Sequence, residues 1–170
     1  MRVAERWLQY YAAGFDGNGG LAAGIRLSRI ERLWRRRLSG RRVETAYEVA
    51  ADIESYPEFL PGVIDARIVA RRNGRWTVDN VFGLWPVRTH FRSFATPEPP
   101  AALTIVSRDG PWREFRLRWR FRAEGADVWA ECDFAAVFRS PVLGLVAATA
   151  IDAAEGMVMD AFERRTRERR

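Results

Sequence analysis

The sequence contains no lysine, a single cysteine (Cys132) and a single histidine (His90). One cysteine excludes an internal disulfide, and zinc sites need several Cys or His ligands, so zinc fingers, CxxC pairs and HExxH motifs are excluded too. All 28 basic residues are therefore arginine, against 22 acidic residues, for a net charge of +6. Because the replacement covers the whole chain, codon composition explains it better than selection at one site.

Long apolar runs are also scarce. The run closest to membrane-span length, Pro141–Ile151, is shorter than the ~20 residues that a spanning helix needs, and Asp152, Glu155 and Asp160 follow it. Charged residues near the N-terminus stand where a signal peptide has its apolar core. We therefore expect no transmembrane segment. The expected location is cytoplasmic, with any membrane contact peripheral and at the inner face of the cytoplasmic membrane.

What the chain does have is enough apolar material for one folded domain. Its 170 residues are 48% hydrophobic, and a chain of this length buries about 70% of its unfolded surface. Residues 1–25 end in a glycine-rich stretch and are expected to form a flexible N-terminal extension. Residues 26–170 are expected to form the domain. Its first segment, residues 26–42, carries eight arginines against Glu31, and part of it is predicted to be a strand with its charge on one face.

The hydrophobic pattern then predicts a helix, a run of strands and a long helix. Apolar residues at spacings of three and four predict a helix over Val43–Ile53. The two prolines of Tyr56–Gly62 turn the next segment into an apolar elbow, and a final helix runs from Pro141 to the chain end. The predicted strands, separated by short turns typical of an antiparallel meander, are Val63–Arg71, Arg75–Phe82, Val87–Ala95, Leu103–Arg108, Trp112–Arg122 and Val128–Phe138.

Strict alternation identifies a buried and a solvated face of this sheet. Residues 115–122 alternate large apolar side chains with four arginines, so the apolar face is predicted to be buried. Asp127, Glu131 and Asp133 on the following strand are expected to neutralise that arginine row. The order of elements predicts an α+β fold, a curved antiparallel sheet of about six to seven strands wrapped around the long C-terminal helix. The helix face with Leu143, Ala147, Ala150, Ala154, Met157 and Ala161 is expected to face the sheet, and its small residues leave room for an apolar ligand.

Neither His90 nor Cys132 is predicted to be catalytic. Cys132 falls on the apolar face of its strand, where a buried thiol is inert. His90 shares a strand face with Arg88 and Arg92, which indicates the solvated side. The sequence therefore predicts no catalytic residue, no metal ligand and no cofactor.

The basic segment 26–42 is the candidate for contact with an anionic partner. The arginine row of residues 115–122 is a weaker candidate. In RRM-type sheets the aromatic residues share the exposed face with the basic residues, whereas in this strand they lie on the opposite face. Anionic lipid headgroups, ribosomal RNA and plain solvation of a strand face all remain open for the segment. The predicted docking residues are Arg32, Arg35, Arg36, Arg37, Arg41 and Arg42.

Five motifs together resemble one known family. They are Tyr56–Pro61, Asp109–Trp112, Trp119–Phe121, Phe138–Ser140 and Ala161–Arg165. In this order they resemble the coenzyme-Q-binding protein family of the START-like polyketide cyclase/dehydrase superfamily, whose bacterial members are often labelled ribosome association toxin A. The resemblance covers roughly residues 28–165. Two departures, Val63 after the elbow and Trp112 in place of the usual Phe, alter the expected shape of the tunnel mouth.

The resemblance implies a helix-grip fold with a hydrophobic tunnel that holds ubiquinone or a related isoprenoid lipid without catalysing a reaction. The residues that it assigns to the mouth and wall of the tunnel, with Met157 added from the helix, are Tyr56, Pro57, Phe59, Leu60, Trp112, Phe115, Leu117, Trp119, Phe121, Met157 and Phe162. The implied role is support of respiratory electron transport or quinone biosynthesis. Two alternatives stay open: a ribosome-associating factor that inhibits subunit joining, and a polyketide cyclase or dehydratase. The oligomeric state is not predicted.

Overall fold

The computed structural model describes residues 29–84 and 87–169. The predicted extension, residues 1–25, lies outside the described residues. The elements in chain order are β1 (Arg29–Leu38), α2 (Val43–Ala51), η1 (Ile53–Ser55), α3 (Tyr56–Phe59), β2 (Val63–Arg72), β3 (Arg75–Leu84), β4 (Val87–Glu98), β5 (Ala102–Ser107), β6 (Trp112–Glu124), β7 (Asp127–Phe138) and α4 (Pro141–Glu168).

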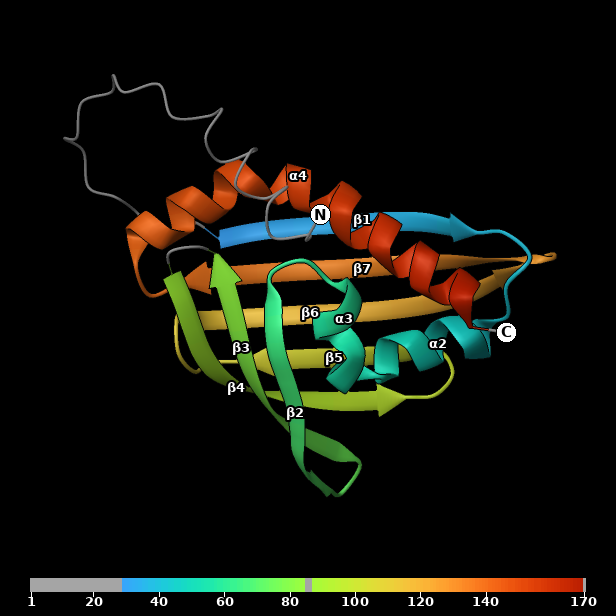
Figure 1. Cartoon of the computed structure of the whole chain (residues 1–170), viewed down its shortest axis with the longest axis horizontal. Helices are drawn as coiled ribbons and strands as arrows, with labels where there is room; N and C mark the ends of the chain where they lie inside the picture. The colour runs from blue at the N-terminus through green and yellow to red at the C-terminus, as the bar shows by residue number, and fades with distance from the viewer. Residues whose placement is uncertain (1–28, 85–86, 170) are drawn as a thin grey trace.

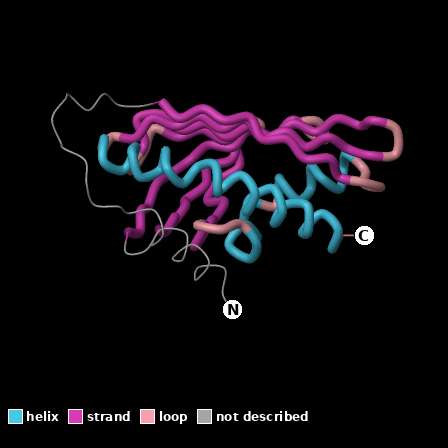
Figure 2. Tube along the Cα trace, turned by 90° about the horizontal axis from the view of Figure 1, so that it is seen from above, coloured by secondary structure: helices cyan, strands magenta, loops and turns pink. Residues whose placement is uncertain are grey.

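The strands form one antiparallel sheet in the order β1-β7-β6-β5-β4-β3-β2 (Figure 1). Strands β2 to β7 follow one another as the predicted meander, whereas β1 joins at the far edge and pairs with β7. Figure 2 shows the helices gathered on one side of the curved sheet. This side is called the inner face below. The predicted helix-grip architecture, with a curved sheet and a long C-terminal helix, is confirmed.

The elbow differs from its prediction because it contains a turn of helix. Helix α2 ends at Ala51, and a 3-10 turn leads into α3, whose first turn holds Pro57. Proline is tolerated there because the N–H groups of a first helical turn have no partner within the helix. The Tyr56 hydroxyl donates a hydrogen bond to the Ala50 carbonyl at 2.5 Å, which fixes the elbow against α2.

Helix α4 begins at a capped N-terminus, where the Ser140 hydroxyl accepts the Leu143 N–H at 3.4 Å. The stripe that it buries lies about one residue beyond the predicted one. Its buried side chains include Ile151, Met159 and Phe162. The predicted Met157 is only half-buried. Because residues 141–158 are apolar or small almost all round the helix, the hydrophobic period does not identify one face there.

Ion pairs with β1 determine how α4 lies. Arg32 pairs with Asp152 at 2.9 Å, and Arg36 pairs with Asp160 at 2.7 Å and with Glu163 at 3.3 Å. Both arginines therefore point to the inner face, which corrects the prediction that the charge of this segment lies on one solvated face. The edge strand is joined to the C-terminal helix by charge as well as by packing.

The 28-residue α4 is longer than the apolar run found in the sequence. It contains an 18-residue window with a mean hydropathy of 1.6, long and apolar enough to cross a membrane by length and composition. Core helices of globular proteins meet the same criterion, but only 17% of this window is buried. Most residues of this apolar window are thus only partly buried or exposed.

Candidate functional site

The inner face of the sheet is aromatic at two places. The first aromatic cluster lies under the C-terminal half of α4, where Phe162 stacks on Trp119 with ring centroids 4.3 Å apart and planes at 19°. Phe121 continues the stack, 6.0 Å from Phe162. Trp119 and Phe162 are 1% exposed. These side chains fill the space between sheet and helix at this end, so they are core residues.

The elbow closes the same end. Tyr56 and Phe59 pack edge to face at 5.8 Å and are buried. Arg165 of α4 lies over the Phe59 ring at 5.5 Å and pairs with Glu58 at 2.6 Å. The elbow is thereby attached to the end of α4.

The second aromatic cluster lies towards the end of the sheet at which α4 begins. Trp112 packs against Phe138, Phe115 and Phe91 with centroid distances of 4.6, 4.9 and 5.6 Å. Phe82 of β3 extends the cluster, 4.8 Å from Phe91. Phe82 and Phe138 are only half-buried. This cluster is therefore less completely covered than the first.

Between the two clusters the inner face is less completely buried. Leu117 and its cross-strand neighbour Phe134 point to the inner face but are half-buried. Trp34 of β1 stacks on Phe134 at 5.8 Å with planes at 3°. Solvent reaches Leu117 and Phe134 on this side, so α4 does not fill the middle of the face. This strip offers apolar contact to a ligand.

Two buried indoles on the inner face have N–H groups without an acceptor among the described residues. They belong to Trp34 and Trp112, which are 4% and 6% exposed. A buried donor without a partner costs free energy, so an acceptor group brought between sheet and helix would be stabilised here. Nearby polarity comes from Asn80, whose side-chain N–H group donates to Ser93 Oγ at 3.0 Å.

Cys132 and Tyr56 are titratable side chains buried on the inner face in the described part of the chain. Burial raises the pKa of the Cys132 thiol, and the Asp133 charge raises it further; the thiol is buried, as predicted. Burial also raises the pKa of the Tyr56 hydroxyl. His90 is exposed on the outer face, as predicted.

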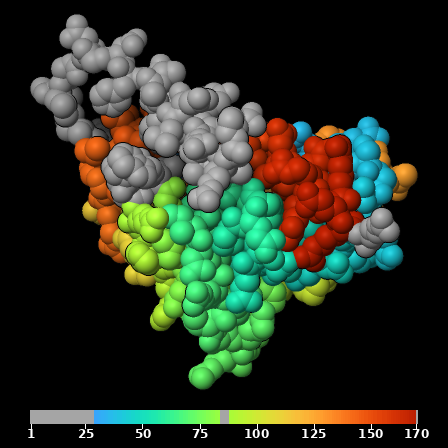
Figure 3. All heavy atoms as spheres, viewed as in Figure 1, coloured from blue at the N-terminus to red at the C-terminus, as the bar shows by residue number. Residues whose placement is uncertain are grey.

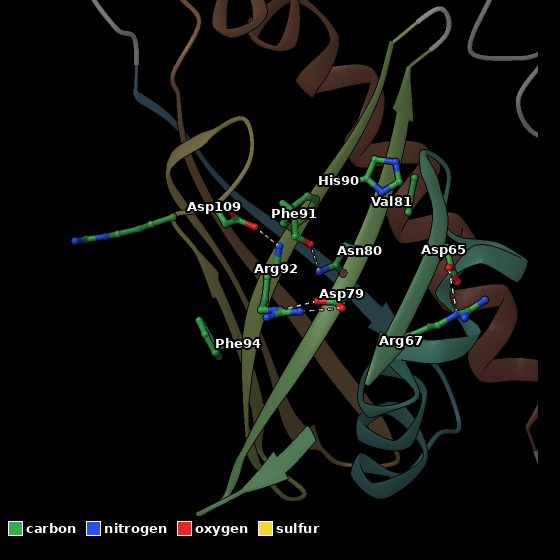
Figure 4. A pocket seen from close by; sticks show the side chains of 11 residues that line it. Asp65, Arg67, Asp79, Asn80, Val81, His90, Phe91, Arg92, Phe94 and Asp109 are labelled. Carbon is green, nitrogen blue, oxygen red and sulfur yellow. Dashed lines mark hydrogen bonds and ion pairs between the residues drawn. The ribbon is translucent and has the colours of Figure 1, made fainter. Parts of the chain in front are cut away.

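The outer face carries two hollows, seen in the described part of the chain. The larger, about 820 Å³, is lined on β3 and β4 by Asp79, His90 and Arg92 among others, with Arg92 paired to Asp79 at 2.6 Å (Figure 4). The smaller, about 390 Å³, lies along the arginine row of β6. Both are open and charged, and neither is the predicted tunnel.

The predicted docking arginines are largely neutralised. Besides the pairs of Arg32 and Arg36 with α4, Arg35 pairs with Glu131 at 3.0 Å, Arg37 with Asp127 at 2.5 Å, and Arg42 with Glu44 at 3.3 Å. The expectation that Glu31 alone opposes this segment is wrong, because its acidic partners come from β7, α2 and α4. Asp127 is correspondingly not available to the arginine row of β6.

The arginine row has other partners. Arg116 pairs with Asp133 at 3.1 Å and Arg120 with Glu131 at 3.2 Å, as predicted. Arg118 lies 3.7 Å from Glu98 of β4. On the outer face of β4, β6 and β7, arginine and acidic side chains thus lie next to one another.

The structure brings most of the predicted lipid-binding residues to the inner face but in different roles. Tyr56, Phe59, Trp119, Phe121 and Phe162 form the closed end, and Pro57 lies half-exposed on the elbow. Leu60 packs half-buried against the core. Trp112, Phe115 and Leu117 line the less buried part of this face. Sequence reasoning missed five aromatic residues there: Trp34, Phe82, Phe91, Phe134 and Phe138. The signal for Trp34 was its spacing of four from Ile30 and Leu38, which puts all three on one strand face.

Known structures share this fold. The Zhui aromatase/cyclase from Streptomyces sp. R1128 superposes with a TM-score of 0.73 at 12% identity, covering 84% of this chain and 96% of that one. An 18 kDa protein from Caulobacter crescentus gives 0.67 at 24% identity, covering 82% and 97%. A START superfamily protein from Mycobacterium smegmatis gives 0.63 at 14% identity, also covering 82% and 97%.

These likenesses establish the fold, and a family model establishes the membership. The model of the polyketide cyclase/dehydrase and lipid transport family matches residues 40–163. The match runs from just before α2 to near the end of α4 and includes both aromatic clusters. The chain therefore belongs to the polyketide cyclase/dehydrase and lipid transport family.

Proposed function

We propose that the protein binds an isoprenoid quinone, such as ubiquinone, or a related lipid between the inner face of the sheet and α4, without catalysing a reaction. The observation that carries this proposal is the half-buried apolar strip at Leu117 and Phe134, bordered by buried indole N–H groups that lack acceptors. A quinone supplies both an apolar tail for the strip and carbonyl oxygens for the indoles. Apolar burial at roughly 25 cal/mol per Å² would provide most of the affinity.

The ionisable groups support binding over catalysis. A cyclase or dehydratase needs a proton donor or acceptor next to its substrate. Cys132 and Tyr56 both have pKa values raised by burial, and His90 lies on the outer face. The family nevertheless contains aromatase/cyclases, so a cyclase is the second candidate, favoured by the buried polar pair Asn80 and Ser93. Turnover of a linear poly-β-ketone mimic, lost in Asn80→Ala, would support it.

The ribosome-associating alternative has less support. It requires free positive charge on the segment 26–42 and at the end of α4. Arg165 pairs with Glu58, and Arg167 and Arg169 pair with Glu163 and Asp52. Sedimentation with ribosomal subunits at low and high salt is the measurement that would revive this candidate.

Extraction of bound lipid and mass spectrometry test the main proposal. We expect the purified wild-type protein to yield a quinone in stoichiometric amount and Leu117→Arg to yield none. Val106→Arg, a change on the outer face of β5, is the matched control and should keep the ligand. A protein that arrives empty and takes up no added ubiquinone would contradict the proposal.

A second measurement tests the indole donors. Trp112→Phe keeps an aromatic ring but removes the N–H group, so the affinity for ubiquinone should fall about two- to tenfold, the worth of one hydrogen bond. Trp129→Phe is the matched control, because that indole lies on the outer sheet face and donates to Glu124. Equal affinities of Trp112→Phe and Trp129→Phe for ubiquinone would contradict a role of the Trp112 N–H group in binding a quinone carbonyl.

A further inference from the structure

Two exposed aliphatic side chains lie on the first turns of α4. Val142 is 62% exposed and Leu145 is 63% exposed. They are three residues apart and therefore share one side of the helix. Figure 3 shows atoms of this part of α4, in orange, at the molecular surface. Large apolar side chains this exposed and adjacent mark a surface that contacts something apolar.

Arginines without an acidic partner among the described residues surround the same end of the molecule. Arg139, just before α4, donates to the carbonyls of Arg108 at 2.8 Å and Gly110 at 3.1 Å. These two hydrogen bonds hold the β5–β6 turn against the start of α4. Arg113 lies in the bulge at the start of β6, next to Trp112, which pairs with Phe138 of β7. The side chains of Arg108, Arg113 and Arg139 are all exposed.

Strand β4 brings a fourth arginine to this end. A side chain at Gly110 would meet the His90 carbonyl at 2.5 Å and Phe91 Cβ at 2.8 Å, so the turn abuts β4. Arg88 lies two residues further along that strand, towards the tip of the β3–β4 hairpin, and is exposed. The starts of β6 and α4 lie together at the left of Figure 1.

The acidic residues at this end leave a positive excess. Glu114 pairs with Arg29 at 2.6 Å. Asp109 accepts the Arg92 backbone N–H at 2.7 Å, and its pKa is lowered by that hydrogen bond and the neighbouring arginine charges. Of the four arginines, Arg139 is the one whose charge acts on Asp109.

We propose that this end of the molecule docks on the surface of a bilayer that contains anionic phospholipid. Val142 and Leu145 insert at the level of the headgroups and upper acyl chains. Arg88, Arg108, Arg113 and Arg139 contact lipid phosphates, which arginine binds through paired N–H donors. The combination of exposed aliphatic side chains and unpaired cations is what an interfacial helix shows.

Other occupants fit less well. Single-stranded RNA is held by aromatic platforms and arginine, whereas the exposed side chains at the centre of this surface are aliphatic. A second copy of the chain, packed about a two-fold axis, would bring the four arginines of each copy towards those of the other. The predicted docking arginines are largely neutralised by ion pairs, with Arg41 the exception among the described residues, so the docking surface moves from β1 to the start of α4.

Vesicle co-sedimentation with the full chain tests this inference independently of the bound ligand. Binding to phosphatidylcholine vesicles that contain phosphatidylglycerol should exceed binding to pure phosphatidylcholine vesicles. Each arginine near an anionic surface is worth about a fivefold change in partitioning, so Arg108→Gln/Arg113→Gln should weaken binding about 25-fold. Leu145→Glu should weaken it at least tenfold, about the value of burying one leucine.

Matched controls place the same changes elsewhere on the surface. Arg72→Gln removes a charge at the β2–β3 turn, and Val69→Glu changes a valine of β2 that is 52% exposed. Both variants should bind vesicles like wild type. Leu145→Gln serves as a milder variant if Leu145→Glu melts early. Equal binding to both kinds of vesicle, or equal losses in the controls, would overturn the proposal. Binding to RNA but not to vesicles would overturn it as well.

Discussion

Trp119 of β6 and Phe162 of α4 stack at 4.3 Å, and this contact fastens the C-terminal half of the helix to the sheet. The pair divides α4 into two functional parts. The second half completes the core, whereas the first half leaves the strip at Leu117 and Phe134 accessible. The proposed lipid binding would use both parts: a fixed end that completes the core and a less buried region that could contact the ligand.

Removing the Phe162 ring should therefore cost stability. Phe162→Ala leaves a cavity in a fully buried stack, and we expect the free energy of unfolding to fall by about 3–5 kcal/mol in urea titrations. Leu145→Ala changes an exposed residue of the same helix and should alter it by less than about 0.5 kcal/mol. Similar losses in both variants would mean that the first half of α4 is packed as tightly as the second.

The ion pair of Arg36 with Glu163 should contribute a small, salt-sensitive coupling. Their side chains are 33% and 18% exposed, so a double-mutant cycle with alanine should give about 0.5–1 kcal/mol. The exposed pair Arg67 and Asp65 should give a value close to zero. Molar salt should reduce the Arg36–Glu163 coupling, and a coupling that salt leaves unchanged would show that packing, not charge, links β1 to α4.

Asp127 should make the fold less stable in acid. Hydrogen bonds from the Gly40 N–H and from Arg37 lower the pKa of this carboxyl below its ordinary value. The unfolded chain then binds a proton more readily than the folded one, so the stabilisation is present above about pH 4 and is lost as the pH falls. Thermal melts from pH 7 to 3 should show a steeper decline for wild type than for Asp127→Asn. Parallel declines would contradict this assignment.

Cys132 should not react while the protein is folded. Its thiol is buried and its pKa is raised, so little thiolate is available at pH 8. Alkylation by iodoacetamide, followed by mass spectrometry, should be slow in buffer and complete within minutes in denaturant. Fast alkylation of the native chain would indicate opening between β7 and α4.

The sequence predicted the sheet well because its signals are local. The alternation of residues 115–122 and the glycine turns determine strand direction and face, and β5 and β6 lie within two residues of their predicted bounds. Strand β4 continues to Glu98, beyond its predicted end at Ala95, since its pairing with β5 extends the ladder. The superfamily and fold inferred from the five motifs are confirmed, whereas membership in the coenzyme-Q-binding family stays a prediction.

The features that could not be predicted from the sequence depend on contacts between residues far apart in the chain. Arg32 and Arg36 share the inner face with Trp34, which is acceptable only because acids of α4, more than 100 residues later, neutralise them. The face of α4 that is buried was equally hidden, because a helix with alanines on every side has no single apolar stripe. Of the candidate site, the aromatic wall on β6 was predictable, but the contributions of β1 and β4 depended on strand order.

The neighbours of β1 also determine when the sheet can be completed. Arg29 pairs with Val137, so the first described strand finds its partner only after nearly the whole chain has been synthesised. Strands β2 to β6 can assemble earlier from local hairpins. Until then β1 has no partner strand, and the mutual repulsion of its five arginines disfavours pairing with the same strand of another chain. The charges that later hold α4 in place thus first protect an unfinished protein from aggregation.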